Sequence, residues 1–87
     1  MMEEKMAMRV LNEAMDRFDG IKLFLEEYDE EFGLITQWDL YPEKKGIEIW
    51  SCYRSDKPGS GWSLTEYRHL IKWEDVPKEY RKELGAE

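Results

Sequence analysis

Few side chains in this sequence have the chemistry that catalysis needs. His69 is the only histidine and Cys52 is the only cysteine. A nucleophilic pair would need Cys52 beside His69, and a serine-based triad would need the same histidine as its base. No motif links these residues by spacing, and a lone histidine is weak evidence for a general base. The sequence therefore predicts no catalytic residue and leaves a small enzyme as the weakest of three functional hypotheses.

Metal and phosphate sites also lack their characteristic residues. Zinc sites use several cysteine or histidine ligands, and the chain has two such residues in total. The loop at 57–61 contains a lysine and two glycines, but its lysine precedes both glycines. A phosphate-binding loop has its lysine after the last glycine. We therefore expect neither a metal nor a cofactor.

An acidic run is the densest cluster of ionisable groups. Five carboxylates occur within six residues, interrupted only by Tyr28: Glu26, Glu27, Asp29, Glu30 and Glu31. The run lacks the alternating oxygen ligands and central glycine of a calcium loop. One interpretation is a solvated hairpin tip whose charge discourages association between sheet edges. The functional interpretation is a docking surface for a basic protein, including one whose groove normally holds nucleic acid.

The charge of the whole chain excludes some partners. The formal net charge is −7, and residues 21–46 contribute −4 of it with seven acids and three bases. Such a protein repels nucleic-acid phosphates and anionic lipids, so we expect no direct nucleic-acid binding and no membrane binding. A lone cysteine is typical of a reducing compartment, and the N-terminus has acids where a signal peptide has bases. These features predict a cytoplasmic protein.

The pattern of apolar residues predicts one α+β domain over residues 1–87. A three- and four-residue spacing indicates a helix over residues 3–18, and Leu11, Met15 and Phe18 lie on its apolar side. The period then changes to alternation over three strands, at 21–28, 34–41 and 47–54. Short connections at 29–33 and 42–46 favour an antiparallel meander.

The segment 62–73 is ambiguous. As a helix, it has a capping box formed by Ser63 and Glu66. As a strand, it has alternating residues with a preference for sheets, from Thr65 to Trp73. We favour the helix and keep a fourth strand as the alternative.

A last helix is expected from Val76 to Leu84. Asp75 is its expected cap, Pro77 lies in its first turn and Gly85 ends it. The predicted fold is thus an N-terminal helix, a three-stranded antiparallel meander and two short C-terminal helices.

Alternation divides the predicted sheet into two faces. The apolar face, expected under helix 3–18, comprises Ile21, Leu23, Leu25, Leu34, Thr36, Trp38, Leu40, Ile47, Ile49 and Tyr53. The other face mixes aromatic residues with charged ones and includes Phe24, Tyr41 and Trp50. Such a mixture is typical of an interface. The alternative is that another helix covers this face.

These patterns favour a non-enzymatic protein-binding module, an inhibitor or regulator of a basic partner. The main alternative is a structural protein that forms a homodimer through the aromatic sheet face. The expected partner-binding residues are Phe24, Glu26, Glu27, Tyr28, Asp29, Glu30, Glu31, Tyr41 and Trp50.

In length, acidity and lack of catalytic motifs, the chain resembles the small inhibitor proteins of phages and mobile elements. Some of those proteins act as anti-restriction or anti-CRISPR mimics of nucleic acid. The resemblance covers no specific residue, and it implies an inhibitor whose acidic surface imitates nucleic acid.

Overall fold

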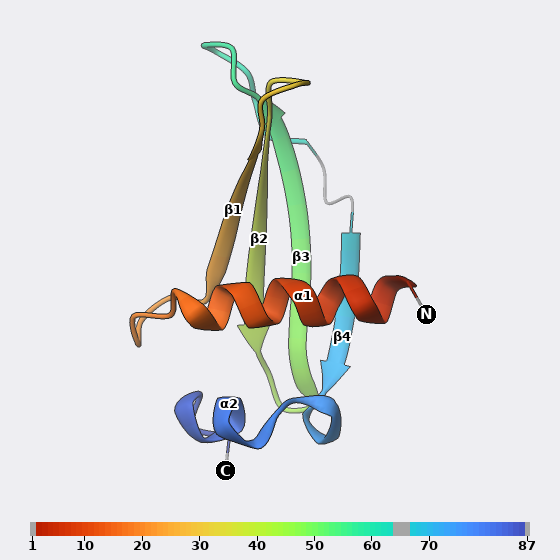
Figure 1. Cartoon of the computed structure of the whole chain (residues 1–87), viewed down its shortest axis with the longest axis vertical. Helices are drawn as coiled ribbons and strands as arrows, with labels where there is room; N and C mark the ends of the chain where they lie inside the picture. The colour runs from red at the N-terminus through yellow and green to blue at the C-terminus, as the bar shows by residue number, and fades with distance from the viewer. Residues whose placement is uncertain (1, 64–66, 87) are drawn as a thin grey trace.

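One long helix crosses one face of a four-stranded antiparallel sheet in the computed structural model (Figure 1). The structure describes residues 2–63 and 67–86. It confirms the predicted α+β class. The elements are α1 (Met2–Asp16), β1 (Phe24–Asp29), β2 (Leu34–Pro42), β3 (Gly46–Ser55), β4 (Tyr67–Lys72), the 3-10 helix η1 (Trp73–Asp75) and α2 (Lys78–Glu83). The strands follow each other in the order β1-β2-β3-β4.

The helix predicted over 62–73 is wrong, and the fourth-strand alternative is confirmed. Strand β4 pairs antiparallel with β3, from Tyr67 opposite Ser51 to Lys72 opposite Gly46. The alternating apolar residues explain this outcome, because Ile71 is fully buried in the core while Lys72 is exposed. The strand also satisfies backbone groups that would otherwise form an open edge of β3. Glu66, one half of the predicted capping box, lies outside the described residues.

The C-terminal helix is shorter than predicted and begins differently. Pro77 is its N-cap residue and no side chain caps it, so the predicted Asp75 cap is wrong. Asp75 belongs instead to η1, which directly follows β4. Gly85 follows the helix with a φ of 75°, the left-handed conformation in which helices often end.

The core lies between α1 and the face of the sheet that we call the inner face. Leu11 is fully buried and Met15 is buried, as the helical spacing predicts. The helix ends at Asp16, two residues before the predicted end, and Phe18 packs against the cluster from the segment after it. Ile21 differs from the prediction: it is 88% exposed, because β1 begins only at Phe24 and Ile21 lies in the preceding turn. The buried core comprises Ala7, Val10, Leu11, Ala14, Met15, Leu23, Leu25, Trp38, Leu40, Ile47, Ile49, Ile71 and Val76.

The opposite side of the sheet, which we call the outer face, carries no helix within the described residues. Helix α2 lies at one end of the sheet on the α1 side, where the Tyr80 hydroxyl donates to Asn12 Oδ1 at 2.9 Å. No described helix is long and apolar enough to cross a membrane. Lys22 precedes β1 but lies on the outer face through its contact with the Phe24 ring. By strand register and alternation, the rest of the outer face comprises Phe24, Glu26, Tyr28, Ile35, Gln37, Asp39, Tyr41, Glu48, Trp50, Cys52, Arg54, Arg68, Leu70 and Lys72.

Candidate protein-binding surface

Trp50 is at the centre of an aromatic and charged cluster on the outer face. Its ring meets the ring of Tyr41 edge-on, with centroids 6.1 Å apart and planes at 83°. The Arg68 guanidinium lies over the other side of Trp50, 4.5 Å from the ring centroid. Arg68 also donates to Glu48 Oε1 at 2.5 Å, and this hydrogen bond holds the pKa of Glu48 below its ordinary value. The cluster therefore presents a tryptophan held by fixed neighbours.

Cations lie over two further aromatic rings. Lys22 Nζ lies 5.0 Å from the centroid of Phe24, and the Arg54 guanidinium lies 5.1 Å from that of Trp62. Both rings are exposed. Cation–π contacts at exposed sites contribute about 0.5–1 kcal/mol, too little to account for leaving such rings in water. Exposed aromatic rings beside cations are the composition that interfaces favour.

The centre of the outer face holds the only cysteine. Burial raises the pKa of the Cys52 thiol, and the nearby charge of Asp39 raises it further. A raised pKa leaves little thiolate at neutral pH, so Cys52 is a poor nucleophile. His69 lies on the inner face, with its Nε2 2.7 Å from Glu4 Oε2. The sheet separates Cys52 from His69, and the two do not form a catalytic pair.

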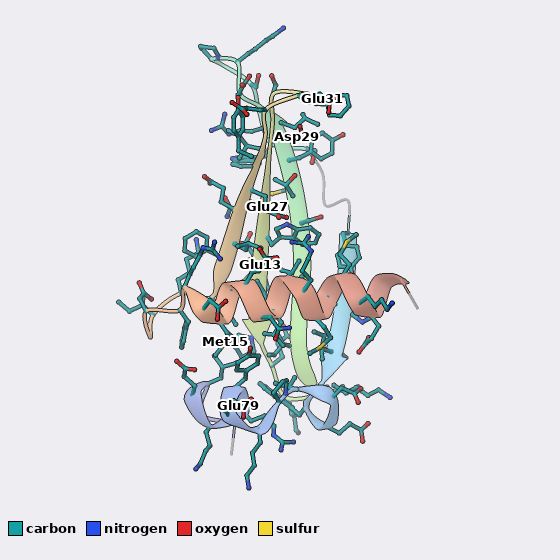
Figure 2. The ribbon with its side chains drawn as sticks, in the orientation of Figure 1. Glu13, Met15, Glu27, Asp29, Glu31 and Glu79 are labelled. Carbon is teal, nitrogen blue, oxygen red and sulfur yellow. The ribbon has the colours of Figure 1, made fainter. Side chains whose placement is uncertain are left out.

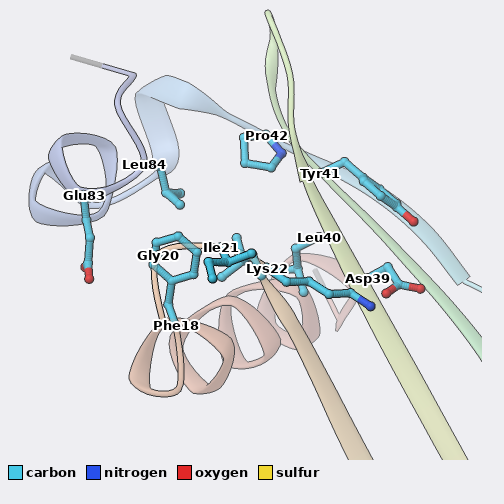
Figure 3. A pocket seen from close by; sticks show the side chains of 11 residues that line it. Phe18, Gly20, Ile21, Lys22, Asp39, Leu40, Tyr41, Pro42, Glu83 and Leu84 are labelled. Atoms are coloured by element: carbon cyan, nitrogen blue, oxygen red, sulfur yellow. The ribbon is translucent and has the colours of Figure 1, made fainter.

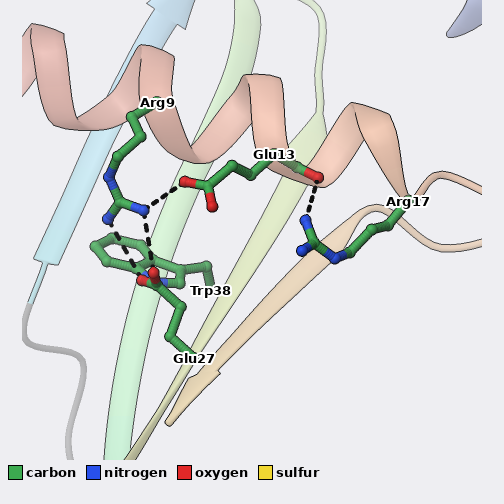
Figure 4. A network of polar contacts seen from close by, with 5 residues as sticks. All are labelled: Arg9, Glu13, Arg17, Glu27 and Trp38. Atoms are coloured by element: carbon green, nitrogen blue, oxygen red, sulfur yellow. Dashed lines mark hydrogen bonds and ion pairs between the residues drawn. The ribbon is translucent and has the colours of Figure 1, made fainter. Parts of the chain in front are cut away.

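Glu27 is separated from the rest of the acidic run by the alternation of β1. It faces α1, where it accepts hydrogen bonds from Arg9 at 3.0 and 3.3 Å and from Trp38 Nε1 at 2.8 Å (Figure 4). Arg9 also donates to Glu13 at 2.6 Å. Partial burial raises the pKa of the Glu27 carboxyl, but the hydrogen bonds from Arg9 and Trp38 outweigh burial and hold it below its ordinary value. Glu27 thus joins the sheet to the helix.

Asp29 and Tyr28 have local structural contacts. Asp29 Oδ1 accepts the backbone N–H groups of Glu31 at 3.0 Å and Phe32 at 3.3 Å, which fixes the turn between β1 and β2. The Tyr28 hydroxyl donates to Asp56 Oδ2 at 2.6 Å. Of the predicted acidic contact residues, Glu26, Glu30 and Glu31 remain exposed, with no ion pair among the described residues.

The far end of the β1–β2 hairpin extends well beyond α1, and Figure 2 shows Asp29 and Glu31 there. The backbone N–H of Asp56 donates to the Gly33 carbonyl at 2.8 Å, which joins the loop after β3 to this turn. We call this end the acidic tip. Asp56 is a member that the acidic run could not reveal, because it is distant in sequence. The charged residues of the tip are Asp29, Glu30, Glu31 and Asp56 with Arg54 and Lys57.

A hollow of about 370 Å³ opens at the other end of the sheet, near the C-terminal end of α2 (Figure 3). Lys22, Asp39 and Tyr41 belong to both this hollow and the outer face. Sequence reasoning missed the hollow, since its walls come from three segments far apart in the chain. Its apolar wall is formed by Phe18, Ile21, Leu23, Leu40, Pro42 and Leu84.

The described residues bring no three histidine, cysteine, aspartate or glutamate side chains together as a metal-ligand group. Comparison with known proteins finds no matching family model, no matching curated protein and no matching solved structure.

Proposed function

We propose that this chain is a non-enzymatic protein-binding module that inhibits or regulates a basic partner. The observation that carries the proposal is the open outer face, on which Phe24, Tyr41 and Trp50 are arranged among charged side chains. Trp, Tyr and Arg are the residues that most often dominate binding energy at protein interfaces. Trp50, Tyr41 and Arg68 lie together on this face.

The acidic tip determines the kind of partner. Its exposed carboxylates include Glu30 and Glu31, which lie at the end of a hairpin that extends past the body of the molecule. Charges at the rim of an interface mainly steer the encounter, so the tip speeds association with a basic surface. Mimicry of nucleic acid is the sharpest form of this proposal. It is supported by the net charge of −7 and by carboxylates held on paired strands.

Two tyrosines of similar exposure on opposite faces give a matched test. Tyr41 on the outer face is 48% exposed, and Tyr53, on the inner face, is 40% exposed. The tagged wild-type chain, Tyr41→Ala and Tyr53→Ala are each used to capture proteins from a lysate of the producing cells, with quantification by mass spectrometry. We expect a basic protein that Tyr41→Ala captures at least tenfold less and Tyr53→Ala captures as the wild type does. Equal capture by both variants would refute the outer face as the binding surface.

A charge reversal tests the steering role of the tip. The double variant Glu30→Lys and Glu31→Lys leaves the Asp29 turn intact and changes the net charge by +4. The control, Glu74→Lys and Glu79→Lys, makes the same change at exposed positions away from the tip. With the captured partner, stopped-flow association should slow more for the tip variant. Equal rates for the two variants would show that the tip does not steer the encounter.

A further inference from the structure

The outer face differs in charge from the rest of the molecule. It has three acids and four bases, for a balance of +1, whereas the other side chains that the structure describes include fourteen acids and nine bases, for −5. Two copies that meet through other surfaces bring strongly acidic groups together. The outer face is the surface on which a second copy meets no such repulsion. Its acids are Glu26, Asp39 and Glu48, and its bases are Lys22, Arg54, Arg68 and Lys72.

The two ends of the sheet also differ in charge. The acidic tip has four acids and two bases, for −2. At the opposite end, a group that we call the basic end has four lysines and three acids, for +1. The molecule is 42 Å long, so the two ends are far enough apart to contact different parts of a partner. The basic end comprises Lys22, Lys44, Lys45 and Lys72 with Glu43, Glu74 and Asp75.

These two charge patterns select one orientation for a symmetric pair. If two outer faces stack with their strands running the same way, tip meets tip and the carboxylates repel. If one copy is turned end over end, each acidic tip lies against the basic end of the other copy, and a single two-fold axis produces both contacts. Only the second arrangement is complementary in charge at both ends of the sheet.

We propose that the outer face binds a second copy of this chain, face to face and antiparallel, with each acidic tip against the other copy's basic end. The inference rests on the proposed function, because it names one occupant of the same binding surface. The aromatic residues Phe24, Tyr41 and Trp50 supply the apolar contact between the sheets, which pack about 10 Å apart in such pairs. A basic partner and the second copy therefore compete for this face.

The area of the outer face indicates how tightly two copies should bind. Four strands about 4.8 Å apart, averaging about eight residues of roughly 3.3 Å each, give a projected area on the order of 500 Å². Stable interfaces bury about 800 Å² per partner, so this pair lies at the small end of the range. We expect a dissociation constant on the order of micromolar, which corresponds to about −8 kcal/mol.

Charge-swapped variants test the orientation directly. The tip variant carries Glu30→Lys and Glu31→Lys, and the end variant carries Lys22→Glu and Lys72→Glu. Sedimentation velocity at concentrations from roughly 1 μM to 1 mM brackets the expected affinity. The wild type should dimerise, and each variant alone should lose at least tenfold in affinity. An equimolar mixture of the two variants should recover a heterodimer. In it, the lysine tip of one variant meets the glutamate end of the other, and the second contact pairs the unchanged acidic tip with the unchanged basic end. Circular dichroism confirms that both variants fold.

The outcomes separate this inference from general charge effects and from the proposed function. The tip variant has a net charge of −3, so charge repulsion alone predicts that it dimerises better than the wild type. That result, or a mixture that stays monomeric, would overturn the antiparallel pair. A wild type that is monomeric throughout would overturn self-association altogether. The lysate comparison of Tyr41→Ala with Tyr53→Ala counts a captured basic protein and not copies of this chain, so failure of the proposed function would be recognised separately.

Discussion

At the scale of single residues, the acidic run shows that neighbours in sequence have different roles. Glu26 and Glu27 are adjacent, yet alternation places the first on the outer face and the second against α1. Both were predicted to bind a partner, because the sequence shows the acidic run but does not show that Arg9 of α1 lies beside Glu27. The contacts of Glu27 with Arg9 and Trp38 instead predict a role in stability.

Glu27→Gln should make the stability of the fold less dependent on pH under acidic conditions. The pKa of Glu27 is lower in the folded state than its ordinary value of 4.5. Its ionised form therefore stabilises the fold fully above about pH 4.5, and this contribution is lost as the pH falls through the depressed folded-state pKa. We expect urea unfolding of the wild type to show a loss of stability below pH 4.5 that is smaller in the variant.

Glu26→Gln, on the outer face, is the control for this experiment. It makes the same change of side chain on the other face of β1 and leaves the contacts of Glu27 with Arg9 and Trp38 in place. Because the Glu27 side chain is 38% exposed, solvent screening keeps the effect small. Parallel pH curves for the wild type and Glu27→Gln would contradict the proposed role of the Arg9 contact.

At the scale of elements, the helical and alternating periods predicted α1 and the first three strands well, because each has one buried face. The segment 62–73 was harder, since its residues fit both periods and the pairing of Tyr67 with Ser51 is a long-range contact. The local sequence favoured a helix, but the segment forms a strand because it pairs with the edge of β3. Strand pairing of this kind cannot be judged from a local window.

The packing of α1 gives a prediction for Leu11. This side chain is fully buried, so Leu11→Ala should lower the free energy of unfolding by about 2–5 kcal/mol. Met6 lies on the same helix and is 40% exposed. Met6→Ala should therefore change stability by only about 0.5 kcal/mol. Chemical denaturation measures both, and a small effect of Leu11→Ala would mean that α1 does not pack on the sheet as described.

The pairing of β3 with β4 gives a second prediction at this scale. A Cβ atom at Gly46 would collide with the backbone carbonyl of Ile71, and backbone atoms cannot move aside cheaply. Gly46→Ala should therefore destabilise the protein by about 1–3 kcal/mol through a shift of β4. At Gly61, a Cβ meets no atom within 4 Å. Thermal melting should show a clear loss for Gly46→Ala and little change for Gly61→Ala, and equal losses would contradict the close approach of β4.

At the scale of the whole molecule, part of the candidate surface was predictable and part was not. Alternation predicted that Phe24, Tyr41 and Trp50 share a face, and their strands place them there. It could not show that the face stays uncovered within the described residues, which depends on where the short C-terminal helix lies. Alternation also could not show that the two ends of the sheet differ in charge. Asp56 reaches the acidic tip, and Lys72 the basic end, through contacts between segments that are distant in sequence.

The antiparallel pair predicts that the melting temperature rises with protein concentration. Only folded chains associate, so dimerisation stabilises the native state by mass action. At about a hundred times the dissociation constant, the gain is roughly 1.5 kcal/mol per chain. For a domain of this size, about 1 kcal/mol raises the melting temperature by roughly 4–8 °C.

Differential scanning calorimetry at protein concentrations from roughly 1 μM to 1 mM should show such a rise for the wild type and for Tyr53→Ala. Tyr41→Ala, which removes an aromatic contact from the outer face, should melt at a temperature that changes much less with concentration. A constant melting temperature for the wild type, or the same rise in Tyr41→Ala, would contradict association through this face.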